Sequence, residues 1–95
     1  MSNHKIEFFR SESWDEYYSI MIDGKKYGQI LLNHTNGEEV VSTCVFIQGV
    51  DDTLHTIDIR NEVKNVRTFF RIVKSFVYLC LNNGAIDLSN PEVDL

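Results

Sequence analysis

The chain has 95 residues and a formal net charge of −5, with 43% hydrophobic and 24% charged residues, a composition typical of one globular domain. The acidic balance argues against direct nucleic-acid binding by the surface as a whole, and no apolar run reaches the roughly 20 residues that a membrane helix needs. The N-terminus lacks the apolar core of a signal peptide. We therefore expect one cytoplasmic domain over residues 1–95, with residues 89–95 as a loose acidic tail.

Five segments rich in β-branched and aromatic residues follow one another, separated by turn residues. The predicted strands are Lys5–Arg10, Glu16–Ile22, Lys26–Asn33, Glu39–Gln48 and Thr53–Ile59. Asp23-Gly24 and Asn36-Gly37 are hairpin signals, because glycine adopts the positive φ that tight turns require. Short connections between successive strands favour an antiparallel meander.

A helix is predicted after the strands, because residues 62–81 contain no Gly or Pro. Asn61 is the expected N-cap, with Asp58 as the alternative, and Asn82-Asn83-Gly84 is a typical C-terminal stop. Ala85–Leu88 is a candidate last short strand. The sequence thus predicts an α+β fold in which a curved antiparallel sheet of about five strands precedes one long C-terminal helix, packed on its concave face.

Apolar residues cover more than half of the circumference of this helix at about 100° per residue. They are Val63, Val66, Phe69, Phe70, Ile72, Val73, Phe76, Val77, Leu79, Cys80 and Leu81. Such a helix needs cover on several sides. Either the sheet curls around it, or a second chain covers part of it, so a homodimer is one of the partners we consider.

Positive charge is concentrated on the same helix. Residues 60–74 carry a net charge of +4, which leaves −9 on the rest of the chain. The spacing 3, 4, 3, 4 places five residues on one helix face, which we call the basic stripe. The basic stripe consists of Lys64, Arg67, Arg71, Lys74 and Tyr78.

The basic stripe has two interpretations. As an anion site it would bind a phosphate-bearing ligand such as a nucleotide, a nucleic-acid backbone or an acidic protein patch, since guanidinium pairs bidentately with phosphate and carboxylate. As a structural feature it would be the solvated side of a buried helix, or would face carboxylates of the same chain.

Acidic residues occur in pairs in or beside the predicted turns, and one of these pairs directly follows the tryptophan. The candidate protein-interface residues are Trp14, Asp15, Glu16, Glu38, Glu39, Asp51 and Asp52. Carboxylates in loops serve solubility, but an acidic face can also occupy the nucleic-acid-binding surface of a basic partner. An exposed tryptophan is a common interface hot spot, whereas a buried one would close the end of the core.

Other chemistry has little support in the sequence. His4, His34 and His55 lack the spacing of metal ligands, and no serine lies in the glycine pattern of a nucleophile elbow. Cys44 and Cys80 lie among apolar residues, as reduced cysteines of a core do. We therefore predict no catalytic residue, no metal and no cofactor.

The stretch EYYSIMIDGKKYGQILL resembles the central hairpin of the GNAT acetyltransferases. The following strand, helix and NNGAIDL resemble that family's strand, coenzyme-A helix and next strand. The family marks the helix entrance with Arg/Gln-x-x-Gly-x-Gly/Ala, whose glycines let backbone amides approach the pyrophosphate. Val63 and Asn65 stand at the glycine positions here. The resemblance therefore implies a degenerate scaffold.

Three functional hypotheses follow. The first is a small acidic, non-enzymatic protein-binding module. It would be of the inhibitor type, like phage anti-defence (anti-CRISPR) or toxin-immunity proteins, and would act on a basic protein that handles nucleic acid. The second is an anion or nucleotide binder that uses the basic stripe. The third is a GNAT-like acetyltransferase or an inactive descendant of one.

Overall fold

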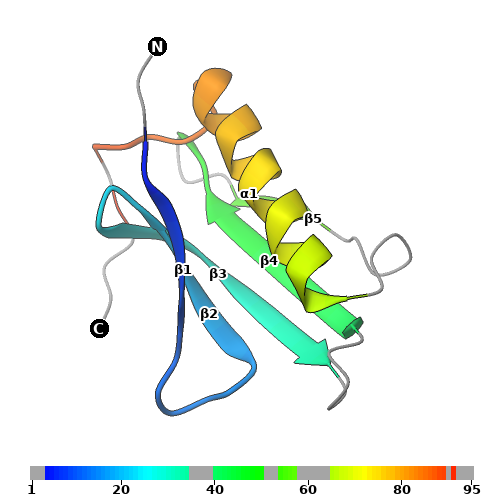
Figure 1. Cartoon of the computed structure of the whole chain (residues 1–95). Coiled ribbons are helices and arrows are strands. Elements are labelled where there is room, and N and C mark those ends of the chain that lie inside the picture. The colour runs from blue at the N-terminus through cyan, green and yellow to red at the C-terminus, as the bar shows by residue number, and fades with distance from the viewer. Residues whose placement is uncertain (1–3, 35–39, 51–53, 58–64, 90, 92–95) are drawn as a thin grey trace.

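The computed structural model describes residues 4–34, 40–50, 54–57, 65–89 and 91. Over these residues the chain forms five strands and then one helix, as predicted (Figure 1). The elements are β1 (Ile6–Arg10), β2 (Tyr17–Ile22), β3 (Lys25–His34), β4 (Val40–Gln48), β5 (Leu54–Ile57) and α1 (Val66–Asn82). The strands pair in the order β1-β2-β3-β4-β5, and every pair is antiparallel. The predicted α+β meander is therefore confirmed.

The hairpin between β2 and β3 turns at Asp23 and Gly24, as predicted, with φ of 51° and 84°. Both residues need positive φ because this turn type matches the twist of the flanking strands. Two residues further on, the pairing register shifts, so that Tyr27 is an extra residue between the pairs Met21–Lys26 and Ile20–Gly28. Such a bulge bends and twists the sheet. The second hairpin signal, Asn36-Gly37, lies outside the described residues.

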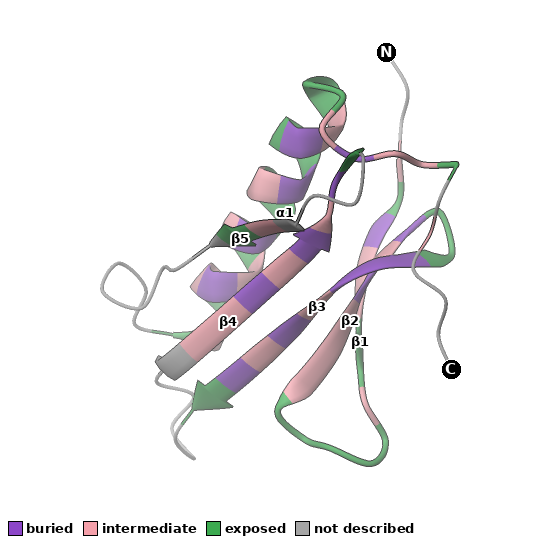
Figure 2. Ribbon diagram, turned by 180° about the vertical axis from the view of Figure 1, so that it is seen from behind, coloured by how far each residue is buried: buried purple, intermediate pink, exposed green. Residues whose placement is uncertain are grey.

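The core lies between α1 and one face of the sheet. From the helix it takes Phe69, Val73, Val77 and Cys80, whose spacing of four, four and three residues places them on one helix face. From the sheet it takes alternate residues of β2, β3 and β4, and Figure 2 shows this alternation as purple and pink bands. These fully buried side chains are Ile20, Ile22, Ile30, Leu32, Val45 and Ile47.

The helix begins later than the sequence suggested. Asn65 is the N-cap: it has an extended backbone, and its side-chain oxygen accepts a hydrogen bond of 2.8 Å from the backbone N–H of Thr68. The prediction that Asn61, or alternatively Asp58, caps the helix is therefore wrong. At the other end, Gly84 has φ of 68° and its N–H donates to the carbonyl of Leu81, which confirms the predicted C-terminal stop.

The segment after the helix is not a strand, so that prediction is also wrong. Its backbone is held by other partners: the Ala85 carbonyl lies 3.1 Å from Nε2 of His55, and the Leu88 carbonyl accepts a hydrogen bond from the Tyr27 hydroxyl. Ile86 between them is buried. The segment thus crosses one end of the sheet (Figure 1) and closes that end of the core.

Substitution of Gly28 tests the close approach of β3 and β4. A Cβ at this position would overlap the carbonyl oxygen of Phe46 on the paired strand, whereas a Cβ at Gly24 meets no atom within 4 Å. Gly28→Ala must therefore push β3 and β4 apart, and we expect it to lower the free energy of unfolding by more than about 2 kcal/mol. Gly24→Ala, which only strains a positive φ, should cost about 1 kcal/mol. Urea denaturation measures both, and equal losses would contradict this account of the sheet.

Candidate functional site

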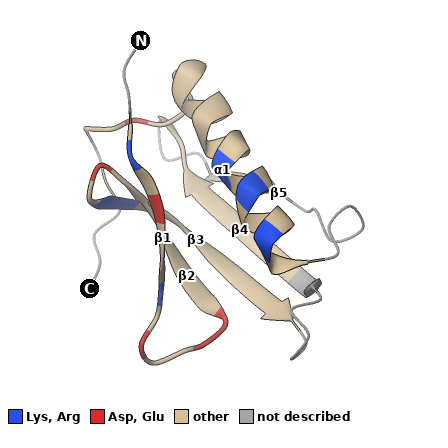
Figure 3. Cartoon of the chain, viewed as in Figure 1, with Lys and Arg blue, Asp and Glu red and all other residues tan. Residues whose placement is uncertain are grey.

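The basic stripe lies on the outward side of α1. Arg67, Arg71 and Lys74 are exposed, and Figure 3 shows their blue positions along the helix. Within the part of the chain that the structure describes, none of these three side chains makes an ion pair or a hydrogen bond. The interpretation in which they face carboxylates of the same chain is therefore not supported for these residues. Lys64 lies outside the described residues.

The last member of the basic stripe has a structural contact. The hydroxyl of Tyr78 donates a hydrogen bond of 3.0 Å to the backbone carbonyl of His4, just before β1. This bond joins α1 to the beginning of the first strand, 74 residues earlier in the chain. Tyr78 therefore links α1 to the chain just before β1.

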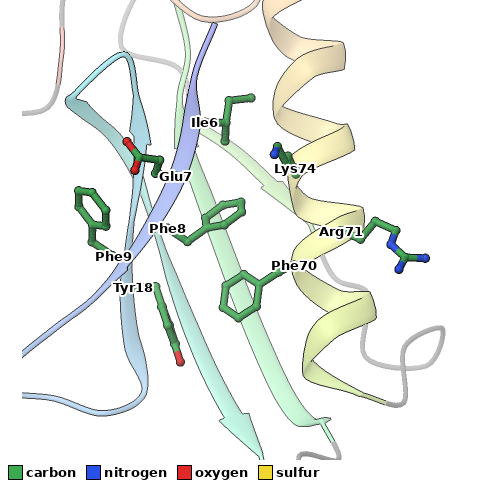
Figure 4. Close-up of a pocket in the computed structure, with 8 residues that line it drawn as sticks. All are labelled: Ile6, Glu7, Phe8, Phe9, Tyr18, Phe70, Arg71 and Lys74. Atoms are coloured by element: carbon green, nitrogen blue, oxygen red, sulfur yellow. The ribbon is translucent and has the colours of Figure 1, made fainter.

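A groove of about 600 Å³ lies between β1 and α1. We call it the β1–α1 groove, and Figure 4 shows its side chains. It is lined by Ile6, Glu7, Phe8, Phe9, Tyr18, Phe70, Arg71 and Lys74. The groove is not predicted from the sequence, although two of its cations, Arg71 and Lys74, belong to the basic stripe. A volume of this size is within the range of ligand-binding clefts.

The floor of the groove is aromatic. The ring of Phe70 on α1 lies 5.1 Å from the ring of Phe8 on β1, and 5.0 Å from the ring of Tyr18 on β2 in an edge-to-face arrangement. The ring of Phe69 lies 5.2 Å from the ring of Phe70, also edge to face. Such contacts fix the orientation of rings beyond what area burial alone achieves. The floor is thus a preformed apolar surface, and Arg71 and Lys74 stand beside it on α1.

The backbone of β1 adds hydrogen-bonding groups along the same groove. The N–H of Asp23 donates to the carbonyl of Lys5, and the N–H of Ser11 donates to the carbonyl of Tyr17. Lys5 and Ser11 therefore turn their backbone groups toward β2. Backbone N–H and C=O groups point to alternate sides of a strand from one residue to the next. Residues 7 and 9 therefore also point these groups toward β2, whereas residues 6, 8 and 10 point them away from β2.

The outward N–H and C=O groups of Ile6, Phe8 and Arg10 are on an edge of the sheet, since β1 pairs only with β2 among the described strands. No hydrogen bond joins them to another described segment. The side chains of Ile6 and Phe8 point into the groove (Figure 4). The open backbone edge and the aromatic floor therefore belong to the same surface.

The beginning of β1 is held in place by the hairpin between β2 and β3. The carboxylate of Asp23 accepts a hydrogen bond of 2.9 Å from the backbone N–H of Lys5 and lies 2.7 Å from Nδ1 of His4. The hydrogen bond with His4, and to a lesser extent the one with the Lys5 backbone, lower the pKa of Asp23 below its ordinary value. Together with the Tyr78 bond, they position β1 beside α1.

A second exposed surface surrounds Trp14, in the loop between β1 and β2. Trp14 is 54% exposed and stacks on Tyr17 with 6.0 Å between the ring centres. Of the two acids beside it, Asp15 pairs with Arg10 at 3.0 Å, and Glu16 is exposed. The tryptophan therefore does not close the core. The other interface candidates, Glu38, Glu39, Asp51 and Asp52, lie outside the described residues.

Metal-ligand and thiol groups are the remaining candidates for chemistry in this fold. Among the described residues, no three His, Cys, Asp or Glu side chains converge on one point. Both cysteines are free: Cys80 is buried in the core, and Cys44 is half-buried on the opposite face of the sheet. Burial raises the pKa of the Cys80 thiol, so this group stays protonated at neutral pH.

The GNAT resemblance does not extend to the segment after the helix. The family's next strand has no counterpart in residues 85–89, and the N-cap side chain of Asn65 occupies the helix entrance. Comparisons of the chain with protein-family models, curated proteins and solved structures found no match. In the described part of the chain, no helix has the length and apolar character to cross a membrane.

Proposed function

We propose that the chain is a non-enzymatic protein-binding module of the cytoplasm and that it docks its partner in the β1–α1 groove. The observation that carries this proposal is the combination of an aromatic floor, two unpaired cations and an open strand edge on one surface. Aromatic residues and arginine are the side chains that dominate the energy of protein interfaces. Phe8, Phe70 and Arg71 supply them in the groove.

The inhibitor role belongs to the same proposal. The charge of −9 outside residues 60–74 would attract a basic, nucleic-acid-handling protein over a distance. Among the described residues, Glu16 beside Trp14 is an exposed carboxylate that the basic surface of such a partner could contact. This attraction should weaken as salt rises, because exposed charges are screened within about 10 Å at 0.1 M ionic strength.

An anion or nucleotide binder is the second candidate function. One specific observation favours it: Arg67, Arg71 and Lys74 are exposed along one helix face without an intramolecular partner in the described chain. In a nucleotide complex, the aromatic floor would stack on the base and the cations would pair with phosphate oxygens.

Site-specific photocrosslinking tests the docking site. A photoreactive amino acid at position 71, in the groove, should crosslink one defined protein in the cell from which the chain comes. The matched control carries the same group at position 56, where Thr56 is exposed on β5, the other edge of the sheet. The position 56 variant should give no such product. Equal products from both positions, or none from position 71, would contradict the proposal.

Thermal shift assays test the second candidate. If the basic stripe binds nucleotides, ATP or polyphosphate should raise the melting temperature of the parent protein. A ligand at 100 times its Kd stabilises by about 2.7 kcal/mol, which a small domain shows as a shift of several degrees. The variant Arg67→Ala/Arg71→Ala should lose this shift. If the parent protein shows no shift with either ligand, the stripe is not a nucleotide site.

A further inference from the structure

We propose that the partner enters the β1–α1 groove as an extended peptide segment that pairs, as an added strand, with the outer edge of β1. The segment would carry a carboxylate close to an aromatic or aliphatic side chain. This inference rests on the proposed function: the partner is basic as a whole, and the one segment of it that enters the groove carries the carboxylate. It follows from three features of the groove: the direction of backbone groups, the shape of the floor and the position of charge.

The backbone of β1 determines the mode of binding. Ile6, Phe8 and Arg10 direct their N–H and C=O groups away from β2, in the plane of the sheet. An extended chain beside β1 would satisfy these groups by continuing the ladder, which is how strand addition supplies affinity without regard to sequence. The Tyr78 hydroxyl already occupies the carbonyl of His4. The edge available to a sixth strand therefore begins at Ile6.

The floor determines which side chains such a strand can carry. An added strand continues the pleat of β1, so every second side chain lies on the same face as Ile6 and Phe8. On that face lie Phe70 and Tyr18, both half-buried and in ring contact. A further aromatic or aliphatic side chain would cover the exposed part of these rings. The hydrophobic effect would supply about 25 cal/mol for each Å² that it removes from water.

The charge of the groove selects the segment. Arg71 and Lys74 line the groove from α1, one helical turn apart, and neither has an ion pair in the described structure. Figure 4 shows the guanidinium of Arg71 extending away from β1. Because this side chain is exposed and has no partner in the described chain, it is free to turn toward a segment in the groove. On the opposite side, the carboxylate of Glu7 lies 3.8 Å from Nζ of Lys5. The unmatched charge on the helix side is thus positive. A carboxylate on the entering strand would pair with it, and a lysine there would be repelled.

A second copy of the chain fits this groove less well. Pairing β1 with β1 of another copy around a two-fold axis would place both helices on the same face of one continuous sheet. On the groove face, the β1 strand of the second copy would carry Ile6, Phe8 and Arg10, which supply no carboxylate to pair with Arg71 and Lys74 and add a further cation. Like charges across an interface are unfavourable. The observations therefore favour a foreign acidic segment over self-association.

Peptide selection tests the proposal. A library of random linear peptides displayed on phage is selected against the full chain, and the strongest peptide is synthesised. We expect it to combine Asp or Glu with aromatic or aliphatic residues two positions apart. The variant Arg71→Glu/Lys74→Glu should bind it at least about tenfold more weakly. The matched control is Arg67→Glu, on the same helix but outside the groove lining, which should change the Kd by less than about twofold.

Two further measurements address charge and backbone pairing separately. A peptide whose acids are replaced by lysine should bind Arg71→Glu/Lys74→Glu better than it binds the parent protein. N-methylation of the selected peptide should abolish binding at alternate residues, whose N–H groups face β1, and be tolerated at the residues between them.

The outcomes separate this inference from the proposed function. If methylation is tolerated at every position, strand addition is wrong, while docking in the groove stands. If the charge variants bind as the parent protein does, the preference for an acidic segment is wrong, and docking in the groove again stands. If sedimentation shows a dimer that the selected peptide dissociates, the occupant is a second copy and the proposal is overturned. If no peptide is selected but position 71 crosslinks a folded protein, only this inference fails. If neither occurs, the proposed function fails with it.

Discussion

The packing of one face of α1 against the sheet is the contact on which the rest of the structure depends. Phe69, Val73, Val77 and Cys80 form the buried face of the helix. A helix with its side chains is about 10 Å wide, whereas five strands spaced about 4.8 Å apart span about 20 Å. One helix therefore cannot cover the whole face. It lies over β4, and the sheet curves so that β1 comes to lie beside it (Figure 1). The β1–α1 groove lies between β1 and α1.

The difference in width between one helix and the sheet explains why the floor of the groove is aromatic and partly exposed. Phe8, Tyr18 and Phe70 sit where the cover of the helix ends, so their rings pack on one another and are only partly shielded from water. The edge strand β1 ends the hydrogen-bonded ladder at the same place. An open edge can pair with a strand of another chain, and natural proteins prevent such pairing with bulges, charges or covering segments. Here the Tyr78 hydroxyl covers only the beginning of the edge, which leaves a surface suited to a partner.

Much of the fold could be predicted because its signals are local. Alternating apolar residues and the Asp23-Gly24 turn defined the strands to within one or two residues, and Asn83-Gly84 defined the end of α1. The first residue of α1 could not be predicted from such local signals. Asn61 and Asn65 both suit an N-cap, and only the structure shows which one bonds to the backbone of the first turn. The apolar residues of the helix are also less completely covered than their number predicts, since Leu79 is 55% exposed.

The candidate site was predictable only in part. Helical spacing was enough to place Arg67, Arg71 and Lys74 on one face, but whether carboxylates of the same chain neutralise them is a tertiary question. The groove itself joins residues from β1, β2 and α1 that lie up to 68 positions apart, from Ile6 to Lys74. No local pattern marks such a surface. The sequence emphasised the acidic pairs, whereas the structure draws attention to an aromatic floor with cations beside it.

Amide hydrogen exchange along β1 in the free protein tests the central claim most directly, because it reports on the edge itself. If the outer edge is open, the amide of Phe8 should exchange quickly, while the amides of Glu7 and Phe9, which face β2, should be protected at least about a hundredfold. This alternation would establish that an unpaired edge borders the groove. Protection of Phe8 equal to that of Glu7 and Phe9 in the monomeric chain would show that another segment already covers the edge, and would contradict the account.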